Sequence, residues 1–414
     1  MQDEPNLYKI VVVGGGAGGL ELVTKLAHQF RRKKHIQVTL VDMKLTHIWK
    51  PLWHEVATGT LASSDNEIGY LLHSHFHGYT FELGSLVGLD RKNKRIQLGP
   101  ISNSEGEIIA PARLLSYDTL IIAIGSICND FNIPGVAEYC LTLDSQQQAE
   151  QFHRQFLQRC MHIEYNETIS PLNIVVVGGG ATGVELIAEL QRVVSQIHDF
   201  GWQNVNLNTI KLSIIESSDR LLQTLKPKLS AAIHDDLSKR GITIYTSQRV
   251  QRIQSNAIIT AQGLTIAADM VVWAAGIKAP IILTQLDGLE INAINQLIVH
   301  QTLQTTVDKD IFAFGDCAYC PQINSGKAVP PRAQAAHQQA TLLVKTMQAH
   351  LADKSLPIYY YKDHGSLISL SQHNAVGQLM SYIPGSLFLE GRIAQFLYWL
   401  LFKEHQAVLL GIWR

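Results

Sequence analysis

The sequence is poor in cysteine, in long apolar runs and in net charge. Its five cysteines form an odd and sparse set in 414 residues: Cys128, Cys140, Cys160, Cys317 and Cys320. Such a set predicts reduced thiols in a reducing cytosol rather than a disulfide framework. No apolar run reaches the about eighteen residues that a transmembrane helix needs, so no single helix is predicted to span a bilayer.

The charge balance and the first residues exclude further classes of protein. A formal net charge of −1 disfavours a nucleic-acid partner, which normally requires a basic excess. A hydrophobic content of 46% with 17% charged residues indicates an ordered globular chain, and its length suits two or three domains. The beginning, MQDEPNLYK, is acidic and has no apolar core, so a signal peptide is not expected.

A glycine-rich turn follows directly after a short apolar run. Ile10 to Val13 predicts a buried parallel strand, and Leu20 to Phe30 has helical patterning. The residues between them match the G-x-G-x-x-G pattern, which permits a tight turn, close approach of a pyrophosphate and packing of the helix on the strand. Free N–H groups at the helix N-terminus favour the phosphates. The predicted contacts are Gly14, Gly16, Ala17, Gly18 and Gly19.

An acidic residue ends the next predicted strand, Ile36 to Asp42. A carboxylate there can accept hydrogen bonds from the two hydroxyls of an adenosine ribose. Asp42 lies further from Gly14 than the roughly 20 positions of the simple fingerprint. The basic insert Arg31 to Lys34 explains the excess, and we interpret this insert as a solvated helix end. Beyond it, Trp49 to Gly59 has no regular amphipathic pattern and predicts a loop that enters a helix beside a flat ring.

The glycine pattern returns in the second half of the chain. Asn173 to Val177 predicts another buried strand, and Glu216, after the strand Leu212 to Ile215, is the counterpart of Asp42. An acid at this place binds the ribose 2′-hydroxyl of NAD and repels the 2′-phosphate of NADP; Arg220 is the one nearby base that argues otherwise. Two such turns predict two bound nucleotides, the pattern of a flavoprotein that handles a nicotinamide cofactor. The expected contacts of the second turn are Gly178, Gly180, Ala181, Thr182 and Gly183.

Two further strands resemble each other. Tyr117 to Ser126 and Met270 to Gly276 both end in small residues, which predicts that backbone passes close to a ligand. The echo predicts two related sheets, the second inserted into the first. The chain then returns to the first domain at Asp310 to Asp316, where a carboxylate can accept hydrogen bonds from a polyol such as the flavin ribityl chain. An ordinary N-cap aspartate is the alternative. The expected contacts are Gly125, Ala275, Gly276, Gly315 and Asp316.

Two clusters of potential ligands favour a structural interpretation. His73, His75 and His77 alternate, so a strand would bring all three to one face. Without a nearby carboxylate or cysteine, we interpret them as solvated side chains rather than a metal site. Cys317-x-x-Cys320 lacks the two further ligands that a zinc ion requires, and Lys50 to Gly59 lacks the cysteine motif of flavin disulfide reductases. We interpret this pair as structural, and no metal site is predicted.

Seven strings occur along the chain: GGGAGGLE (14–21), KPLWHEVATG (50–59), GGGATGVELIAEL (178–190), VVWAAGIKAP (271–280), FGDCA (314–318), PPRAQAAHQQA (330–340) and YKDHGSL (361–367). Together they resemble a type II NADH:quinone oxidoreductase, the single-subunit, non-pumping respiratory dehydrogenase, of the bacterial branch. The resemblance covers nearly the whole chain. The two glycine strings are common to many flavoprotein reductases, whereas PPRAQAAHQQA and YKDHGSL are much more specific.

The resemblance implies roles for particular residues. Ala333 and Gln334 would lie beside FAD, and Gln334 and Gln338, which share one helix face, would grip the carbonyl oxygens of a quinone; ordinary polar helix residues are the alternative. Glu185 would reach the nicotinamide and shape the junction between the cofactors. Relatives carry lysine or histidine at His364, where an imidazolium would support anionic flavin or supply a proton; a solvent-facing loop is the alternative. Further FAD contacts are expected at Lys50, Pro51 and Leu52.

The composition changes in the last segment, Ser386 to Arg414. Such a helix, polar on one face and apolar on the other, is predicted to lie in a membrane interface; a core or dimer-interface helix is the alternative. Bacterial relatives commonly continue past the position of Arg414, so anchoring is expected to be weaker or to need dimerisation. The predicted polar face is Arg392, Gln395, Trp399, Lys403 and Gln406, opposite Ile393, Phe396, Leu397, Leu400 and Leu401.

We therefore predict an α/β protein with two Rossmann-like dinucleotide-binding domains, the second inserted in the first, and a C-terminal α+β region with an amphipathic helix. The predicted domains are residues 1–144 with 279–355 for FAD, 145–278 for NADH, and 356–414 for the membrane and quinone side.

The expected activity is the reduction of ubiquinone or menaquinone by NADH through non-covalent FAD, without proton pumping. The expected place is the cytoplasmic face of the inner membrane, as a peripheral protein, with a homodimer left open. One alternative is a sulfide:quinone oxidoreductase, which needs paired cysteines near the flavin. The other is an NADH-sensing flavoprotein of the apoptosis-inducing type.

Overall fold

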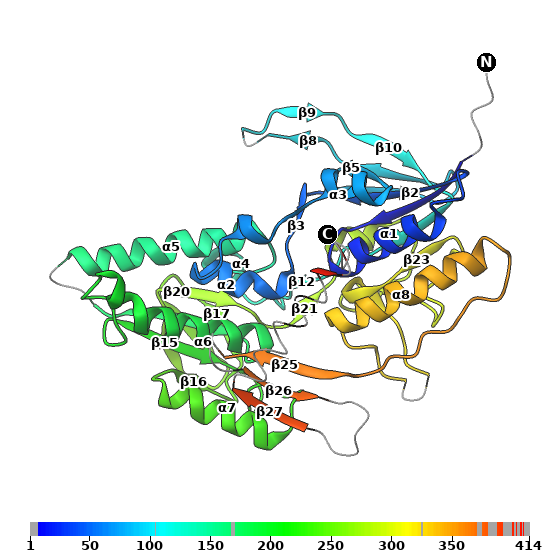
Figure 1. The fold of residues 1–414 in the computed structure, drawn as a ribbon. Coiled ribbons are helices and arrows are strands. Elements are labelled where there is room, and N and C mark those ends of the chain that lie inside the picture. The colour runs from blue at the N-terminus through cyan, green and yellow to red at the C-terminus, as the bar shows by residue number, and fades with distance from the viewer. Residues whose placement is uncertain are drawn as a thin grey trace.

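The structure is a computed structural model that describes residues 7–103, 105–166, 170–323, 326–370, 375–379 and 387–391, with residues 400, 403, 406, 407 and 409. Its first sheet has five parallel strands in the order β23-β11-β1-β2-β5. Helices α1 (Ala17–Phe30) and α8 (Ala333–His350) pack against each other beside this sheet (Figure 1). The strands are β1 (Tyr8–Val13), β2 (Ile36–Asp42), β5 (Thr80–Leu83), β11 (Thr119–Ile122) and β23 (Ile311–Ala313).

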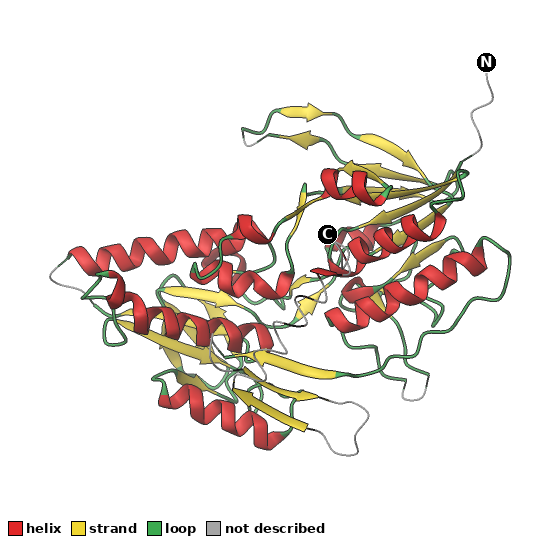
Figure 2. Ribbon diagram, viewed as in Figure 1, coloured by secondary structure: helices red, strands yellow, loops and turns green. Residues whose placement is uncertain are grey.

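A second five-stranded parallel sheet has the order β13-β20-β14-β15-β16. Its strands lie between β11 and β23 in the sequence, which confirms that the second unit is inserted in the first. Helices flank both sheets (Figure 2). The elements are β13 (Cys140–Leu141), β14 (Leu172–Val177), β15 (Ile210–Ile215), β16 (Thr243–Tyr245), β20 (Met270–Trp273), α5 (Gln146–Tyr165), α6 (Ala181–Gln196) and α7 (Pro227–Lys239).

Smaller sheets extend both units. In the first, β8 (Ile101–Ser102) and β9 (Ile108–Ala110) form the arm at the top of Figure 1, beside the sheet of β6 (Leu86–Asp90), β7 (Arg95–Leu98) and β10 (Arg113–Ser116). The second has β17 (Val250–Ile253), β18 (Ala257–Thr260) and β19 (Thr265–Ala267). The C-terminal region contains an antiparallel sheet, in keeping with the predicted α+β class: β25 (Gly365–Ser369), β26 (Ala375–Leu379) and β27 (Leu387–Gly391).

Short elements complete the described chain. The paired strands are β3 (Thr46–His47) with β4 (Ile68–Gly69), β12 (Ile127–Cys128) with β21 (Ile277–Lys278), and β22 (Leu297–Ile298) with β24 (Ala318–Tyr319). The short helices are η1 (Lys50–Leu52), α2 (Trp53–Thr58), η2 (Ser63–Asn66), α3 (Tyr70–His77), α4 (Val136–Tyr139), η3 (Ile197–Phe200), η4 (Ile281–Gln285) and η5 (Gly315–Cys317).

The two strand-to-helix turns have the same geometry. Gly14 and Gly178 have φ angles of 104° and 116°, in the region that favours glycine. The N–H group of each donates to the carbonyl at the end of the neighbouring strand, at 2.8 Å in both turns. A Cβ atom at Gly19 or Gly183 would lie 1.8 or 1.9 Å from the carbonyl oxygen of Gly14 or Gly178. Each helix therefore packs against its strand only because the third glycine has no side chain.

Helix α2 joins the two units by packing. It precedes the second sheet by many residues, yet Trp53, Val56 and Ala57 belong to the apolar core that contains α5 and α6. Ile368, in β25, belongs to the same core. Helix α2, which was predicted to belong to the FAD domain, therefore packs in the core of the second unit. Elements of both units form the boundary between the two sheets.

The histidine-rich segment is a helix, so the predicted alternation on a strand is wrong. Glycines end α3 on both sides, and Gly78 has φ 77°, a common helix C-terminus. His73 is buried, with Nδ1 2.9 Å from the hydroxyl of Tyr79, and is not solvated as expected. His75 is exposed. The rings of His73 and His77, one helical turn apart, stack with their centroids 4.1 Å apart, whereas His75 lies on another face, so the three side chains do not share one face.

The predicted amphipathic helix lies largely outside the described residues. Arg392, Gln395 and Trp399 are among those not described, whereas Lys403 and Gln406 are helical and their side chains meet at 2.8 Å. The same segment begins with strand β27, which the helical pattern did not predict. Within the described ranges, no helix combines the length and the apolar character needed to cross a membrane.

Substitution of Gly183 by alanine tests the close packing of helix α6. We expect the Gly183→Ala variant to lose about 1–3 kcal/mol of unfolding free energy, because its Cβ overlaps the carbonyl of Gly178. Urea unfolding measured without NADH gives the value. Gly69→Ala is the matched control, since a Cβ there meets nothing within 4 Å. Equal stability of the two variants would contradict the packing argument.

Candidate functional site

The two glycine turns leave the first turns of their helices open. Gly16 and Gly180 are the N-caps of α1 and α6, and no side chain accepts a hydrogen bond from either helix end. A Cβ at Gly16 or Gly180 would meet nothing within 4 Å. Ala181 and Thr182 are exposed, and Gly18 packs on Phe314 and Ala336. Free N–H groups that face open space are the chemistry that a diphosphate requires.

Asp42 and Glu216 occupy equivalent places in the two turns. Oδ2 of Asp42 accepts a hydrogen bond from the Gly15 N–H group at 2.6 Å, and Oε2 of Glu216 accepts one from the Gly179 N–H group at 2.7 Å. The second oxygen of each also accepts from a backbone N–H group, at 2.8 Å. Burial raises the pKa of Asp42, and the backbone N–H groups oppose this shift. Both carboxylates are held beside the open helix ends. The Arg220 guanidinium donates to the carbonyl of Gln223 instead.

The ends of β11 and β23 bring a second group of predicted residues together. Ser126, which follows Gly125, donates its hydroxyl to Oδ2 of Asp316 at 2.8 Å. The ammonium of Lys50 donates to the Ser126 carbonyl at 3.0 Å. Gly315 donates its N–H group to Oε1 of the buried Gln339 at 2.8 Å. The sequence did not single out Ser126 or Gln339, although Gln339 lies in the PPRAQAAHQQA string.

The N-terminus of α8 points to this group. The helix begins at Ala333 without a side-chain cap, since Arg332 is the N-cap residue. Ala336 lies against both Gly18 and Gly315, at 3.1 and 3.7 Å from the Cβ position of each glycine. The dipole of α8 therefore adds positive potential beside the first glycine turn and Asp316.

Gln334 and Gln338 bind the main chain of the following segment. Gln334 donates to the Gly365 carbonyl and accepts from the His364 N–H group, both at 3.0 Å. Gln338 donates to the Lys362 carbonyl at 2.7 Å and accepts from the Lys362 N–H group at 3.0 Å. That both amides grip the carbonyl oxygens of a quinone stays a prediction; in this structure each amide already donates one hydrogen bond to the backbone and accepts one from it. They hold the exposed His364 in place through its backbone.

A cluster of carboxylates surrounds a buried imidazole between α2 and α6. The two nitrogens of His54 lie 3.9 Å from Oε1 of Glu55 and 3.9 Å from Oε2 of Glu185. Burial lowers the pKa of His54 to about 4, against the charge of Glu189, so the ring is neutral near pH 7. Burial and Glu189 raise the pKa of Glu55 to about 7, and Arg192 opposes this. Glu185 is buried beside this neutral ring, at the start of α6.

A second buried carboxylate links α1 to α8. Glu21 forms an ion pair with His337 of α8 and another with Lys25, one helical turn away. Burial alone would raise the pKa of Glu21, but hydrogen bonds and charges from His337 and Lys25 together lower it. The sequence placed both Glu21 and His337 in motifs without giving them a role. Their pairing fixes α8 against the helix of the first glycine turn.

The cysteines are unsuited to thiolate chemistry. All five are free, and Cys160, Cys317 and Cys320 are buried. Burial raises the pKa of Cys128, Cys140, Cys160 and Cys317 to about 12 and that of Cys320 to about 11. Because the thiolate is the nucleophile, neutral buried thiols argue against the sulfide:quinone alternative. They fit the structural interpretation of Cys317 and Cys320.

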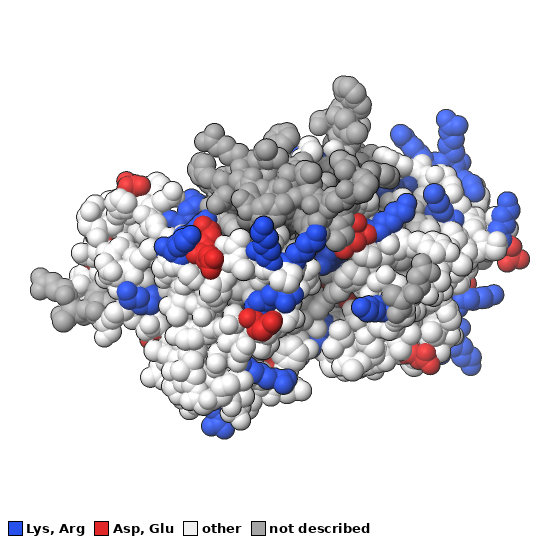
Figure 3. Space-filling model, turned by 90° about the horizontal axis from the view of Figure 1, so that it is seen from below, with Lys and Arg blue, Asp and Glu red and all other residues white. Residues whose placement is uncertain are grey.

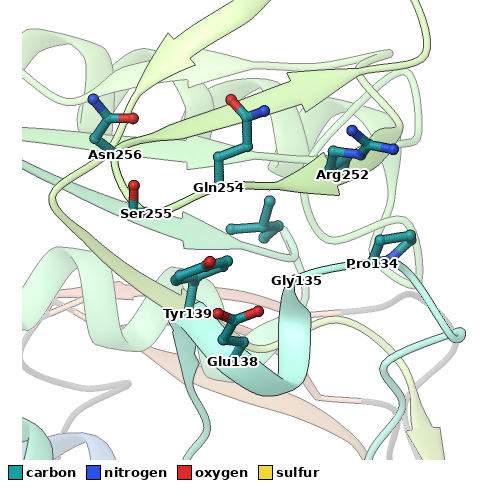
Figure 4. Close-up of a pocket in the computed structure, with 9 residues that line it drawn as sticks. Pro134, Gly135, Glu138, Tyr139, Arg252, Gln254, Ser255 and Asn256 are labelled. Carbon is teal, nitrogen blue, oxygen red and sulfur yellow. The ribbon is translucent and has the colours of Figure 1, made fainter.

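A surface depression of about 430 Å³ lies away from both turns, between α4 and the β17–β18 hairpin (Figure 4). Its exposed polar side chains include Glu138 of α4, Arg252 of β17 and Asn256 of the turn between β17 and β18. None of the predicted nucleotide or quinone contacts lines it. The glycine turns therefore remain the site that the chemistry of the residues supports.

The chain is similar in sequence and fold to one group of oxidoreductases. Residues 8–340 match the family model of pyridine nucleotide-disulphide oxidoreductases. A type II NADH:quinone oxidoreductase of Haemophilus influenzae is 42% identical over 98% of this chain and 95% of its own length. NDH2 of Plasmodium falciparum, solved with NADH, has a TM-score of 0.83 at 20% identity, covering 96% of this chain and 94% of that one. The sulfide:quinone oxidoreductase of Aquifex aeolicus has a TM-score of 0.76 at 17% identity, covering 98% and 92%.

Loss of the Gln338 amide is expected to loosen the segment that carries His364. In Gln338→Leu, the Lys362 N–H group loses its acceptor, so hydrogen exchange of residues 359–365 should become about tenfold faster even without a quinone. Deuterium uptake followed by mass spectrometry measures this. Lys345→Ala, on the exposed face of the same helix, is the control. Unchanged exchange in Gln338→Leu would mean that the amide does not hold the main chain.

The pKa of Glu55 predicts a pH-dependent difference in stability. Between pH 4.5 and about 7 the folded protein keeps a proton that the unfolded chain loses, so wild type loses stability as pH rises through this window. Glu55→Gln removes this loss. The unfolding free energy of the variant should rise by about 1–3 kcal/mol relative to that of wild type as the pH is raised from 4.5 to about 7. Urea unfolding across pH gives the difference, with Glu138→Gln on α4 as the control; parallel curves for wild type and Glu55→Gln would refute the prediction.

Proposed function

This chain belongs to the type II NADH:quinone oxidoreductase family, and we infer that it passes electrons from NADH to a quinone through non-covalently bound FAD. The pairing of β12 with β21 carries this proposal. β12 leaves the first sheet after β11, and β21 leaves the second sheet after β20, so the carboxyl edges of the two sheets adjoin. Two nucleotides bound at these edges would meet at the boundary, as hydride transfer between two rings requires.

The first turn suits FAD and the second suits NADH. In the first, Asp42 would accept the ribose hydroxyls and Asp316 would accept from the ribityl chain, with the N-terminus of α8 nearby. In the second, Glu216 would accept the ribose 2′-hydroxyl of NADH. Further proposed FAD contacts are Gly14, Gly16, Ala17, Gly18, Gly19, Lys50, Pro51, Leu52, Gly125, Gly315, Ala333 and Gln334. Further proposed NADH contacts are Gly178, Gly180, Ala181, Thr182, Gly183, Glu185, Ala275 and Gly276.

The residues of the chain bind and orient rather than react covalently. FAD, when bound, supplies a ring that accepts a hydride and passes two electrons on, and the net reaction consumes a proton with NADH and quinone. We assign Glu185 to the nicotinamide, beside the buried and neutral ring of His54. The N-terminal dipole of α8 would favour negative charge on a flavin ring bound beside that helix end. Gln334 and Gln338 support the quinone side by fixing the backbone at His364, whose imidazole is placed to exchange a proton with solvent.

The remaining assignments concern place and assembly. We propose peripheral attachment to the cytoplasmic face of the membrane through the C-terminal segment, where Lys403 and Gln406 are helical. A homodimer would add a second anchor. The substrate is proposed to be a membrane quinone, either ubiquinone or menaquinone.

Stopped-flow absorbance tests the proposed reaction directly. NADH should bleach the flavin absorbance of the purified protein under anaerobic conditions, and a ubiquinone or menaquinone analogue should restore it within one turnover. NADPH should bleach it about a hundredfold more slowly, because Glu216 repels the 2′-phosphate. A colourless protein that stays so after incubation with FAD would refute the proposal. Bleaching without recovery would instead indicate an NADH sensor.

The Glu216→Gln variant isolates the nucleotide preference. It should narrow the gap between NADH and NADPH, mainly through KM, while the rate of reoxidation by quinone stays the same. Asp219→Asn is the matched control, because this neighbouring carboxylate is 73% exposed and lies outside the turn. An equal preference in wild type and Glu216→Gln would remove Glu216 from the nucleotide site.

A further inference from the structure

Helix α3 presents its apolar side chains to the outside of the molecule. Leu71 and Leu72 are each 64% exposed and Phe76 is 55% exposed. The opposite side of the helix, with Tyr70 and His73, is buried. A soluble surface helix normally has the reverse arrangement, with its apolar stripe against the core. A single exposed leucine is common on protein surfaces and needs no explanation. Three large apolar side chains on the outward face of one short helix are a different case.

The loop between β2 and β3 enlarges the apolar surface. Met43 and Leu45 are 69% and 51% exposed. The Leu45 carbonyl accepts a hydrogen bond from the Tyr70 N–H group at 2.9 Å, and the adjoining strands β3 and β4 are paired. The loop and the first turn of α3 are thus side by side. We call Met43, Leu45, Leu71, Leu72 and Phe76 the α3 surface.

Basic residues border the far end of the α3 surface. His77, the last residue of the helix, lies 3.1 Å from His28 in the last turn of α1. The chain continues from that turn into Arg31, Arg32, Lys33 and Lys34, all exposed. An apolar face with a basic edge matches the interface of a bilayer that contains anionic lipid. Figure 3 shows the molecule from below, a face on which charged side chains of both signs are visible.

The C-terminal segment meets α3 from within. Nε2 of His73 lies 2.9 Å from the carbonyl oxygen of Leu409, which is buried in the core of the first sheet. Leu409 belongs to the segment whose composition predicts an interfacial helix. Leu409 therefore lies against the inner, His73 side of α3, on the other side of the helix from the exposed α3 surface.

We propose that the α3 surface contacts lipid and lies flat on a phospholipid bilayer that contains anionic lipid. This inference rests on the proposed function only in that a quinone is dissolved in the bilayer. The apolar side chains enter the interface, and the basic residues after α1 face the lipid phosphates. Attachment then has two parts, the C-terminal segment and the α3 surface. Helix α3 is tied to the first glycine turn, because the Tyr70 hydroxyl donates a hydrogen bond to the Gly15 carbonyl at 2.7 Å.

Vesicle binding by the full-length, flavin-loaded protein tests the proposal. The triple variant Leu71→Ser, Leu72→Ser, Phe76→Ser should bind vesicles of phosphatidylcholine with phosphatidylglycerol about tenfold more weakly than wild type. The control is Tyr165→Ser, Phe200→Ser, Ile281→Ser, whose side chains are 77%, 83% and 65% exposed on other elements. Equal binding of wild type and the α3 variant, or equal losses in both variants, would overturn the proposal.

Two further measurements separate the other outcomes. If the α3 variant changes the molecular mass in solution instead of vesicle binding, the surface is an interface between copies, and the proposal is wrong. In wild type, hydrogen exchange of residues 70–77 should slow with vesicles while that of residues 197–200 does not, so the test stands even if the variant folds poorly. NADH oxidation with a water-soluble quinone should be equal in both proteins; its absence in wild type would instead refute the proposed function.

Discussion

The site depends on one steric constraint: a helix must begin within a few residues of a buried parallel strand. At Gly19 and Gly183 only a hydrogen atom fits between helix and strand, because the carbonyl of the first glycine stands in the place of a Cβ. The close approach directs the first N–H groups of each helix to the edge where the strands end. Asp42 and Glu216 reach the same edge, since their strands are the parallel neighbours of β1 and β14. The anion site and the hydroxyl acceptor thus follow from one packing relation, and it occurs twice.

What turns two similar sheets into one site is the way the chain crosses between them. Helix α2 leaves the first unit and packs in the apolar core of the second, and β25 does so from the other end of the chain. The crossings place His54 against Glu185, and they place the Gln334 and Gln338 amides against the backbone that leads into β25. Each crossing uses polar groups at the boundary and apolar groups in the core. The boundary is therefore fixed by the apolar packing of α2 and β25 together with the hydrogen bonds of the two amides to the backbone.

The parts of the molecule that local sequence could predict are those whose physics is local. The glycine turns, the strands before them and the acids after the next strand were placed correctly because each depends on neighbours within one strand–turn–helix unit. The backbone contacts of Gln334 and Gln338 could not be predicted, because their partners, Lys362 and Gly365, lie far along the chain and offer only backbone atoms, which carry no sequence signal. His73 was misjudged for another reason. Eight residues fit a strand or a helix by periodicity, and the glycines at both ends of α3 were the signal that could have decided it.

The orientation of α3 reflects a choice between burying its three apolar side chains and burying Tyr70 and His73. Burying Leu71, Leu72 and Phe76 would stabilise the folded chain by about 1.5–3 kcal/mol each. Facing inward, Tyr70 buries its ring in the apolar core of the first sheet, and Tyr70 and His73 add hydrogen bonds of about 1 kcal/mol each at the carbonyls of Gly15 and Leu409. In water the side chains of Leu71, Leu72 and Phe76 therefore stay exposed, while the inner side of α3 supports the first glycine turn. A lipid surface removes that same apolar area from water without disturbing the inner side, so one helix can serve the cofactor loop on one face and the bilayer on the other.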